Sequence, residues 1–272
     1  MRDRGGHVVL RATALFSLAV AIFGLAIMQP ITSTTDIAYA ASLNVRRQPT
    51  KGLLIDVGML GSGNIPTLSD LRQARFTLVG TQVTGDGDWP KIGSWITSVH
   101  QEGLRAFVFI TTYVTKDLQV TGAWTKKAAS LGADVVILDE IISGSNADAT
   151  AMWSIIEAGL AVNPNLQFII TEYDSYSLQV AYSWTSQYPS VRVANDEYDS
   201  KSRIDVNIQL GLNYRKRAYT WLVFNGVSQN FDCYLHLDDW MTYVKQRNTD
   251  VLFYWINGNP AWATQWPKAQ SF

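Results

Sequence analysis

The chain has 272 residues, of which 47% are hydrophobic, and a formal net charge of −1. That hydrophobic content is typical of a globular chain with a large core and excludes a disordered protein, while the near-zero charge argues against a nucleic-acid partner. Aromatic residues make up 12% of the chain and include ten Trp, a surplus that suits both a large core and surfaces that stack on sugar rings.

Residues 1–40 have the layout of a secretory signal peptide. A basic start with three Arg leads into an apolar run over residues 12–28, and the small-x-small sequence Ala-Tyr-Ala stands at 38–40. We therefore expect the signal to be cleaved and residues 41–272 to be secreted, without a stable membrane partner. An uncleaved membrane anchor is the alternative, because the apolar run is long enough to approach the span of a bilayer.

The cysteine and histidine content limits the chemistry. Cys233 is the only cysteine, so it cannot form an internal disulfide, and the exported domain depends on its core for stability. The three His show neither His-x-His nor His-Glu-x-x-His spacing, so a Cys-His nucleophile and a zinc site are not expected. We expect neither a cofactor nor a metal ion.

Short runs rich in Val, Ile and Phe recur along the rest of the chain. Continuous apolar runs, rather than alternating ones, are typical of parallel strands that are covered on both faces. We expect eight such strands, starting at Gly52, Phe76, Arg105, Asp134, Leu166, Val191, Ala218 and Asp250.

Amphipathic segments lie between these runs and predict helices. Apolar residues repeat at helical spacing over residues 92–99, and Gly103 follows as a stop signal. Similar stripes occupy residues 152–160, 203–217 and 237–244. Strand–helix units of this length predict an α/β protein with a single (β/α)8 barrel. A doubly wound open sheet is the alternative, but the G-x-G-x-x-G turn of its nucleotide-binding members is missing after the first run.

Acids and amides cluster after the carboxyl ends of the predicted strands. In a (β/α)8 barrel these ends meet at one rim, which is where active sites of such barrels are found. Asp148 and Asp174 are expected to begin helices instead. The rim set consists of Asp56, Asp139, Glu140, Glu172, Asn195, Asp196, Glu197, Asn225 and Asn257.

Several carboxylates without a His, a metal motif or a phosphate loop suit glycoside hydrolysis best. That reaction needs one acid to protonate the leaving oxygen and one carboxylate to act as nucleophile or base. Crowding of acids raises the pKa of at least one of them, which keeps a proton available near neutral pH. Trp124, Trp240 and His100 are expected to be structural. The aromatic residues that could bind sugar faces at the rim are Tyr113, Tyr173, Tyr198, Trp255 and Trp262, although Trp255 could equally fill the barrel.

Two short motifs resemble a known group of enzymes. The sequence VVILDEI closes the fourth predicted strand and VANDEYD the sixth, and both are similar to motifs of the spherulin-4-like hydrolases and the endo-α-1,4-polygalactosaminidases. The resemblance implies cleavage of α-linked galactosamine or N-acetylgalactosamine stretches in microbial exopolysaccharides, with Asp139 and Glu140 as the strand-four acids and Glu197 as the strand-six acid. The first strand departs from the pattern, since Asp56 stands where spherulin-4-like proteins tend to carry a Tyr-Pro-type ending.

The resemblance suggests roles for these acids. Asp139 and Glu197 are the expected pair, one as nucleophile or base and the other as general acid, and Glu140 is the third catalytic candidate. Glu140 or Glu172 would position a sugar or tune the acid. Neighbouring strand residues point to opposite faces, so only one of Asp139 and Glu140 can face the barrel mouth unless the strand has already ended. The expected substrate-binding residues are Asp56, Glu172, Tyr173, Tyr198, Asn225, Trp255 and Asn257.

The expected partner is a polysaccharide or oligosaccharide, bound by a monomer, but two other classes of protein stay open. A barrel that binds glycans without cutting them would share the fold, since fold alone does not establish activity. A metal-dependent barrel enzyme could use Asp56, Glu140 and Glu172 as oxygen ligands for Mg²⁺ or Ca²⁺.

Overall fold

The computed structural model of the chain describes residues 50–63, 65–115, 117–143, 147–195, 201–224, 237–247, 249–255, 267, 270 and 271. All of them belong to one compact unit, Arg47–Phe272. The predicted signal peptide, residues 1–40, lies outside these ranges. Within the described part of the chain, no helix is both long enough and apolar enough to cross a membrane.

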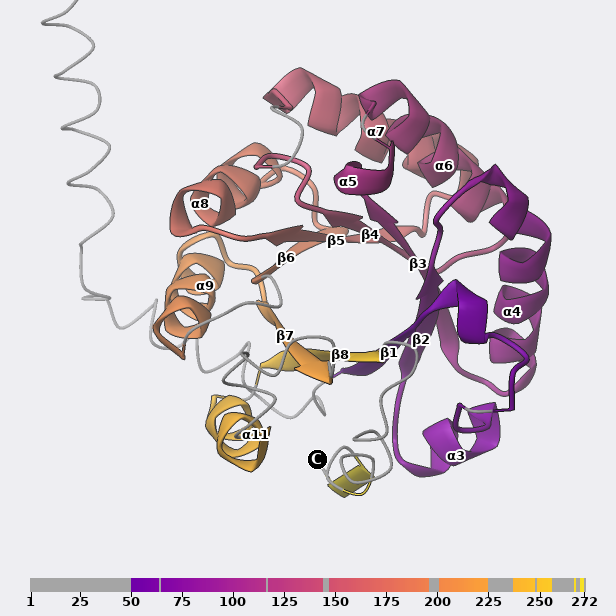
Figure 1. The fold of residues 1–272 in the computed structure, drawn as a ribbon. Coiled ribbons are helices and arrows are strands. Elements are labelled where there is room, and N and C mark those ends of the chain that lie inside the picture. Colours follow the sequence, from indigo (N-terminus) through magenta and orange to yellow (C-terminus); the bar gives the residue numbers. More distant parts are fainter. Residues whose placement is uncertain are drawn as a thin grey trace, which may run out of the picture. The chain divides into compact units, whose positions relative to one another are not determined.

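Eight parallel strands form a closed barrel, which confirms the predicted architecture (Figure 1). Each strand pairs with the next one in the sequence, and the last pairs with the first. Each strand begins within about two residues of its predicted start. The strands are β1 (Lys51–Ile55), β2 (Leu78–Gln82), β3 (Arg105–Thr111), β4 (Val135–Asp139), β5 (Gln167–Glu172), β6 (Val191–Asn195), β7 (Tyr219–Phe224) and β8 (Asp250–Trp255).

The helices surround the barrel and cover its outer face (Figure 1). Trp124 and Trp240 pack into this layer with 8% and 2% of their surface exposed, as expected for core residues. His100 lies 2.9 Å from the Asp134 carboxylate at the helix–strand junction, which is a structural role. The helices are η1 (Val57–Met59), α3 (Leu68–Gln73), η2 (Asp86–Asp88), α4 (Trp89–Gln101), α5 (Thr112–Thr115), α6 (Leu118–Ser130), α7 (Ala149–Val162), α8 (Ser175–Trp184), α9 (Lys201–Asn213) and α11 (Leu237–Gln246).

The predicted helix over residues 203–217 was wrong at its C-terminal end. Helix α9 stops at Asn213, and Arg215 adopts a left-handed conformation with φ of 55°. The Lys216 N–H then donates to the Gly211 carbonyl at 2.7 Å, which closes the helix end. Apolar spacing does not reveal this stop, because an Arg occupies the left-handed position that Gly more often takes.

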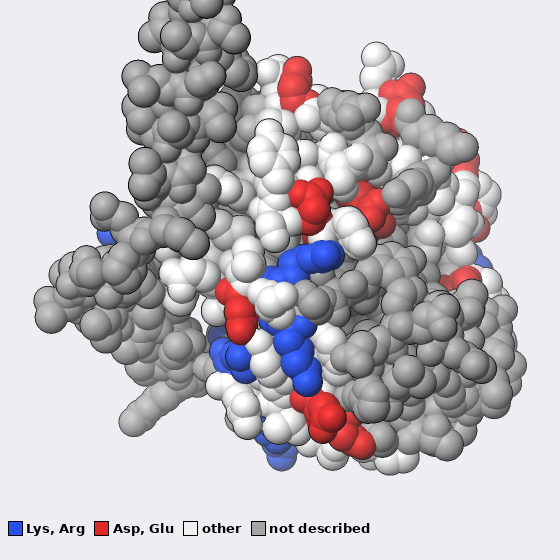
Figure 2. Space-filling model, turned by 60° about the vertical axis from the view of Figure 1, so that its left-hand side comes forward, with Lys and Arg blue, Asp and Glu red and all other residues white. Residues whose placement is uncertain are grey.

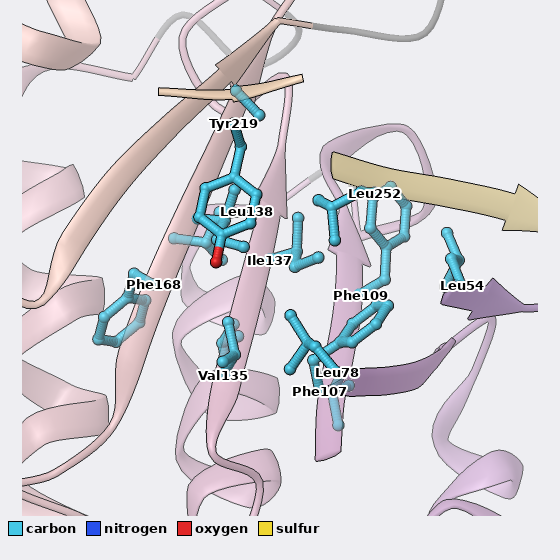
Figure 3. Close-up of a cluster of buried hydrophobic side chains, with 14 of the residues drawn as sticks. Leu54, Leu78, Phe107, Phe109, Val135, Ile137, Leu138, Phe168, Tyr219 and Leu252 are labelled. Carbon is cyan, nitrogen blue, oxygen red and sulfur yellow. The ribbon is translucent and has the colours of Figure 1, made fainter. Parts of the chain in front are cut away.

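The barrel interior is filled by side chains from alternate positions of the strands, as Figure 3 shows for Leu78, Phe107, Val135 and Leu252. Gly80 on β2 leaves room for its neighbour on β3. A Cβ at this position would lie 2.2 Å from the Phe107 carbonyl oxygen and 2.4 Å from its ring. The side chains nearest the N-terminal end therefore form a packed core and not a channel.

Asp148→Ala should lower the free energy of unfolding by about 1 kcal/mol. Asp148 is the N-cap of α7, and its Oδ1 accepts from the Ala151 N–H at 2.8 Å, as its position in the sequence predicted. Alanine leaves that N–H without its acceptor, whereas Asp148→Asn keeps an oxygen in place. Urea unfolding of both variants checks this: equal losses would show that the carboxylate does not act as a cap.

Candidate active site

Asp139 closes β4 on the inner side of the barrel. Val135 and Ile137 point into the barrel (Figure 3), and Asp139 continues the same alternation two residues further along. The carboxylate is half-buried, and its Oδ1 accepts from the Thr171 hydroxyl at 2.5 Å. Thr171 is the residue next to Asp139 in the β4–β5 register. The structure therefore places Asp139 where the catalytic groups of (β/α)8 barrels stand.

Glu140 follows Asp139 in a left-handed conformation with φ of 48°. The strand has ended at this point, so the alternation that would send Glu140 to the opposite face from Asp139 no longer applies. Its backbone is fixed on both sides: its N–H donates to the Thr171 carbonyl at 2.9 Å, and its own carbonyl accepts from the Thr112 hydroxyl at 2.9 Å.

The Glu140 side chain is buried with one carboxylate oxygen unsatisfied. Only 8% of the residue is exposed, and among the described residues no group makes a hydrogen bond to Oε2. A buried polar atom without a partner is costly, and such atoms gather at functional sites where a ligand completes the contact. Together with the strained backbone, this feature keeps Glu140 a candidate site residue.

Glu172 ends β5 beside these two acids and is completely buried. Its Oε1 accepts from the Ile142 N–H at 2.8 Å, and its Oε2 accepts from the Ser143 N–H at 3.2 Å and the Ser143 hydroxyl at 2.9 Å. Burial is the main cause that raises the pKa of Glu172 to about 7; the three hydrogen bonds oppose this shift and the negative charge of Glu140 adds to it. The sequence predicts a pKa raised by crowding of acids, whereas burial is the main cause of the raised pKa of Glu172 and the charge of Glu140 adds less.

Asp56 and Tyr173 also lie at the C-terminal ends of their strands. Asp56 follows β1 and caps η1, with Oδ1 accepting from the Gly58 N–H at 2.6 Å. Tyr173 follows Glu172 and is 44% exposed. The Arg203 guanidinium lies 4.7 Å from the centre of the Tyr173 ring.

Tyr176 is 74% exposed on the first turn of α8. The sequence does not predict this exposure, because nothing in a helical position distinguishes an exposed aromatic residue from a core one.

Two further polar residues near the strand ends, one of them from the predicted rim set, have structural roles. Asn195 is buried, and its side-chain oxygen accepts from the Asn207 amide on α9 at 3.4 Å, so it faces the helices and not the barrel mouth. Asp174 is the N-cap of α8, as predicted, and its Oδ1 accepts from the Ser177 N–H at 2.9 Å. A strand-terminal position therefore does not by itself place a side chain in the site.

Several predicted site residues cannot be placed. Trp255 ends β8, but its side chain is not among those described. The same holds for the side chain of Tyr113 in α5. The others lie outside the described residues: Asp196, Glu197, Tyr198, Asn225, Asn257 and Trp262. Their roles stay predictions.

The charged groups do not form a metal centre within the described ranges, where no three of the His, Cys, Asp and Glu side chains are grouped to hold an ion. The face shown in Figure 2 carries acidic and basic side chains next to each other, in keeping with the near-zero net charge. The arrangement thus consists of carboxylates at the C-terminal ends of neighbouring barrel strands, with one carboxyl group that titrates near neutral pH.

Fold and site together define a (β/α)8-barrel protein with acidic side chains at the rim where barrel enzymes work. The chain matches no family model and no curated protein. Among solved structures it is similar to the citrate synthase SbnG, at 11% identity over 85% of this chain and 96% of that one, with a TM-score of 0.52.

An HpcH/HpaI aldolase from Desulfitobacterium hafniense DCB-2 is similar at 10% identity, covering 82% of this chain and 91% of that one, with a TM-score of 0.50. The GH53 catalytic domain of Ignisphaera aggregans matches with a TM-score of 0.48 at 10% identity, over 79% of this chain and 81% of that one, a likeness too weak to carry an argument. Most of these neighbours are enzymes, and identities this low show the shared fold alone.

Proposed function

We propose that this protein is a secreted glycoside hydrolase that cleaves an exopolysaccharide, with α-1,4-linked galactosamine and N-acetylgalactosamine chains as the substrates to test first. The observation that carries the proposal is the position of Asp139, a half-buried carboxylate on the inner side of the barrel at the end of β4. The buried Glu172, with a pKa of about 7, lies behind this position and supports the chain that follows Asp139.

The roles follow from the requirements of the reaction. The Thr171 hydroxyl donates to the Asp139 carboxylate and fixes its orientation. Asp139 is therefore suited to act as nucleophile or base, and Glu197 is left as the general acid that protonates the leaving oxygen. The separation of the two carboxyl groups would determine the stereochemistry, at about 5 Å for retention and about 6.5–9.5 Å for inversion.

Glu140 is suited to bind the sugar. Its Oε2 has no hydrogen-bond partner among the described residues, and 8% of the residue is exposed, so a small rearrangement on binding would let a sugar hydroxyl supply the missing donor. The exposed ring of Tyr173 lies one residue after Glu172 and offers an apolar face for a sugar ring. Substrate binding would thus satisfy a group that is costly to leave unpaired, and the gain would appear as affinity.

The test is cleavage of a defined polymer. The purified protein is incubated with partially deacetylated α-1,4-linked galactosamine polymer, and new reducing ends are measured with and without EDTA. We expect reducing ends to accumulate equally in both. Activity that EDTA abolishes would instead favour the metal-dependent enzyme, and no new reducing ends on this or other exopolysaccharides would contradict the proposal.

Glycan binding without cleavage is the second candidate function, and the exposed aromatic residues Tyr173 and Tyr176 are the observation that favours it. Affinity electrophoresis in gels that contain the same polymer separates the two functions. Retarded migration without new reducing ends would identify a glycan-binding protein, and Tyr176→Ala should then restore much of the mobility.

A further inference from the structure

Glu172 holds the segment that follows the proposed site. The three donors to its carboxylate are the N–H of Ile142 and the N–H and hydroxyl of Ser143. These residues come directly after Asp139, Glu140 and Ile141, although Glu172 itself is on the next strand. A fully buried carboxylate of one strand therefore fixes the chain that leaves its neighbour.

This attachment bears on the conformation of Glu140. A non-glycine residue with φ of 48° persists only where its surroundings hold it, and here the contacts act from both sides. Before Glu140, the Asp139–Thr171 pairing and the bond from the Thr112 hydroxyl to the Asp139 carbonyl fix the strand end. After it, the bonds to Glu172 fix Ile142 and Ser143. Without the hydrogen bonds to Glu172, the chain after Glu140 could relax to an ordinary extended conformation, and the Glu140 carboxylate would move with it.

We propose that Glu172 is a positioning residue of the site: its ionised carboxylate anchors Ile142 and Ser143 and thereby holds Glu140 with one oxygen left to accept a hydroxyl of the polysaccharide. The role of Glu140 toward substrate rests on the proposed function, whereas the anchoring of the loop does not. Glu172 has no exposed surface, so it acts through Glu140 and not by contact with the sugar.

The anchor weakens when Glu172 takes a proton. The ionised group can accept all three hydrogen bonds, whereas a protonated carboxyl offers fewer acceptor positions to the same donors. Because burial raises the pKa of Glu172 to about 7, this change falls near neutral pH, with the anchor made above about pH 7 and loosened below it.

Among the described residues, the surrounding charges do not provide another group that explains such a transition. Glu140, at the end of β4, is the charged group that acts on the Glu172 pKa. Asp139 on β4 is bound to Thr171. At the start of α8, burial would raise the pKa of Asp174, but its hydrogen bonds to Ser177 and the charge of Arg203 outweigh this effect, so the pKa is lowered. A transition near pH 7 at this place is therefore expected to come from Glu172.

The first experiment compares pH profiles of kcat for the wild type and Glu172→Gln. Glutamine is neutral at every pH, and its amide has one oxygen to accept with, so it keeps only part of the anchor. We expect kcat of the wild type to rise through a transition near pH 7. In Glu172→Gln kcat should be roughly a hundredfold lower, as for a misplaced reactive group, and the transition should be absent.

Two matched variants separate positioning from a general loss of stability. Ser143→Ala removes one of the three donors without changing a charge, so it should lower kcat less and keep the transition near pH 7. Glu157→Gln makes the same chemical change on the exposed side of α7, where the Glu157 carboxylate accepts from the Tyr188 hydroxyl, and should leave the profile unchanged. A transition near pH 7 that persists in Glu172→Gln would overturn the proposal.

A second measurement does not depend on activity. Amide NMR shifts of Ile142 and Ser143 are followed from pH 5 to 9, and both should titrate with a midpoint near 7 in the wild type and in Ser143→Ala. Amides that do not titrate would overturn the anchor even if the protein cleaves polysaccharide. If they titrate while the protein cleaves no glycan, the anchor is supported and the hydrolase assignment alone fails. Because the wild type suffices, the test holds even if Glu172→Gln does not fold.

Discussion

Asp139→Asn is expected to lower the rate of polysaccharide cleavage by roughly 10²–10⁴-fold with little change in the melting temperature. The asparagine has nearly the same shape and keeps an oxygen that can accept from the Thr171 hydroxyl, so the end of β4 should stay in place. The charge that would attack the sugar carbon, or activate a water to do so, is lost. Initial rates of reducing-end release and thermal unfolding of the same samples measure both effects.

Glu197→Gln should have an effect of the same order if Glu197 is the general acid, and substrates with a good leaving group should be less affected because they need less protonation. Glu102→Gln is the control, since Glu102 follows α4 at the opposite end of the barrel strands and makes an exposed ion pair with Arg72. It should retain the wild-type rate. If Asp139→Asn keeps more than a tenth of that rate, Asp139 is not a catalytic group.

The barrel was predictable because its sequence signal is repeated. Each strand is buried on both faces, so each reads as a continuous apolar run, and the amphipathic segments between the runs supply the covering helices. The predicted bounds were wrong where a local backbone conformation ended a helix. The left-handed Arg215, which closes α9, is an example, because neither a Gly nor a Pro follows Asn213 to mark the stop.

The site was predictable only as far as strand ends could be located. Asp139 was placed correctly at the end of β4 because its position follows from the preceding apolar run. The left-handed conformation of Glu140 and the orientation of Glu172 toward Ser143 depend on contacts between residues about thirty positions apart. No local pattern encodes such contacts. Sequence reasoning therefore identified Glu172 as a substrate-binding residue, whereas its complete burial and loop contacts give it a positioning role.

The opposite end of the barrel contains an ion cluster that the sequence did not suggest. Asp250, at the start of β8, accepts from the Thr50 N–H at 2.6 Å and lies 3.5 Å from Arg192 and 3.2 Å from Arg217. Its side chain is only 3% exposed. The carboxylate thus joins β8, the start of β1 and the two arginines, at the place where β8 closes the ring onto β1.

Asp250→Ala is expected to lower the free energy of unfolding by about 3–5 kcal/mol, because it leaves two largely buried guanidinium groups without this counter-charge and one N–H without its acceptor. A loss of this size is a large part of the stability of an ordinary domain. Asp205→Ala removes an equally paired carboxylate, bound by Arg247 and Tyr243, whose side chain is 49% exposed. Since water can replace its contacts, that variant should lose at most about 1 kcal/mol. Urea unfolding at neutral pH compares the two variants. Similar losses of unfolding free energy would show that the burial of Asp250 does not account for its contribution to stability.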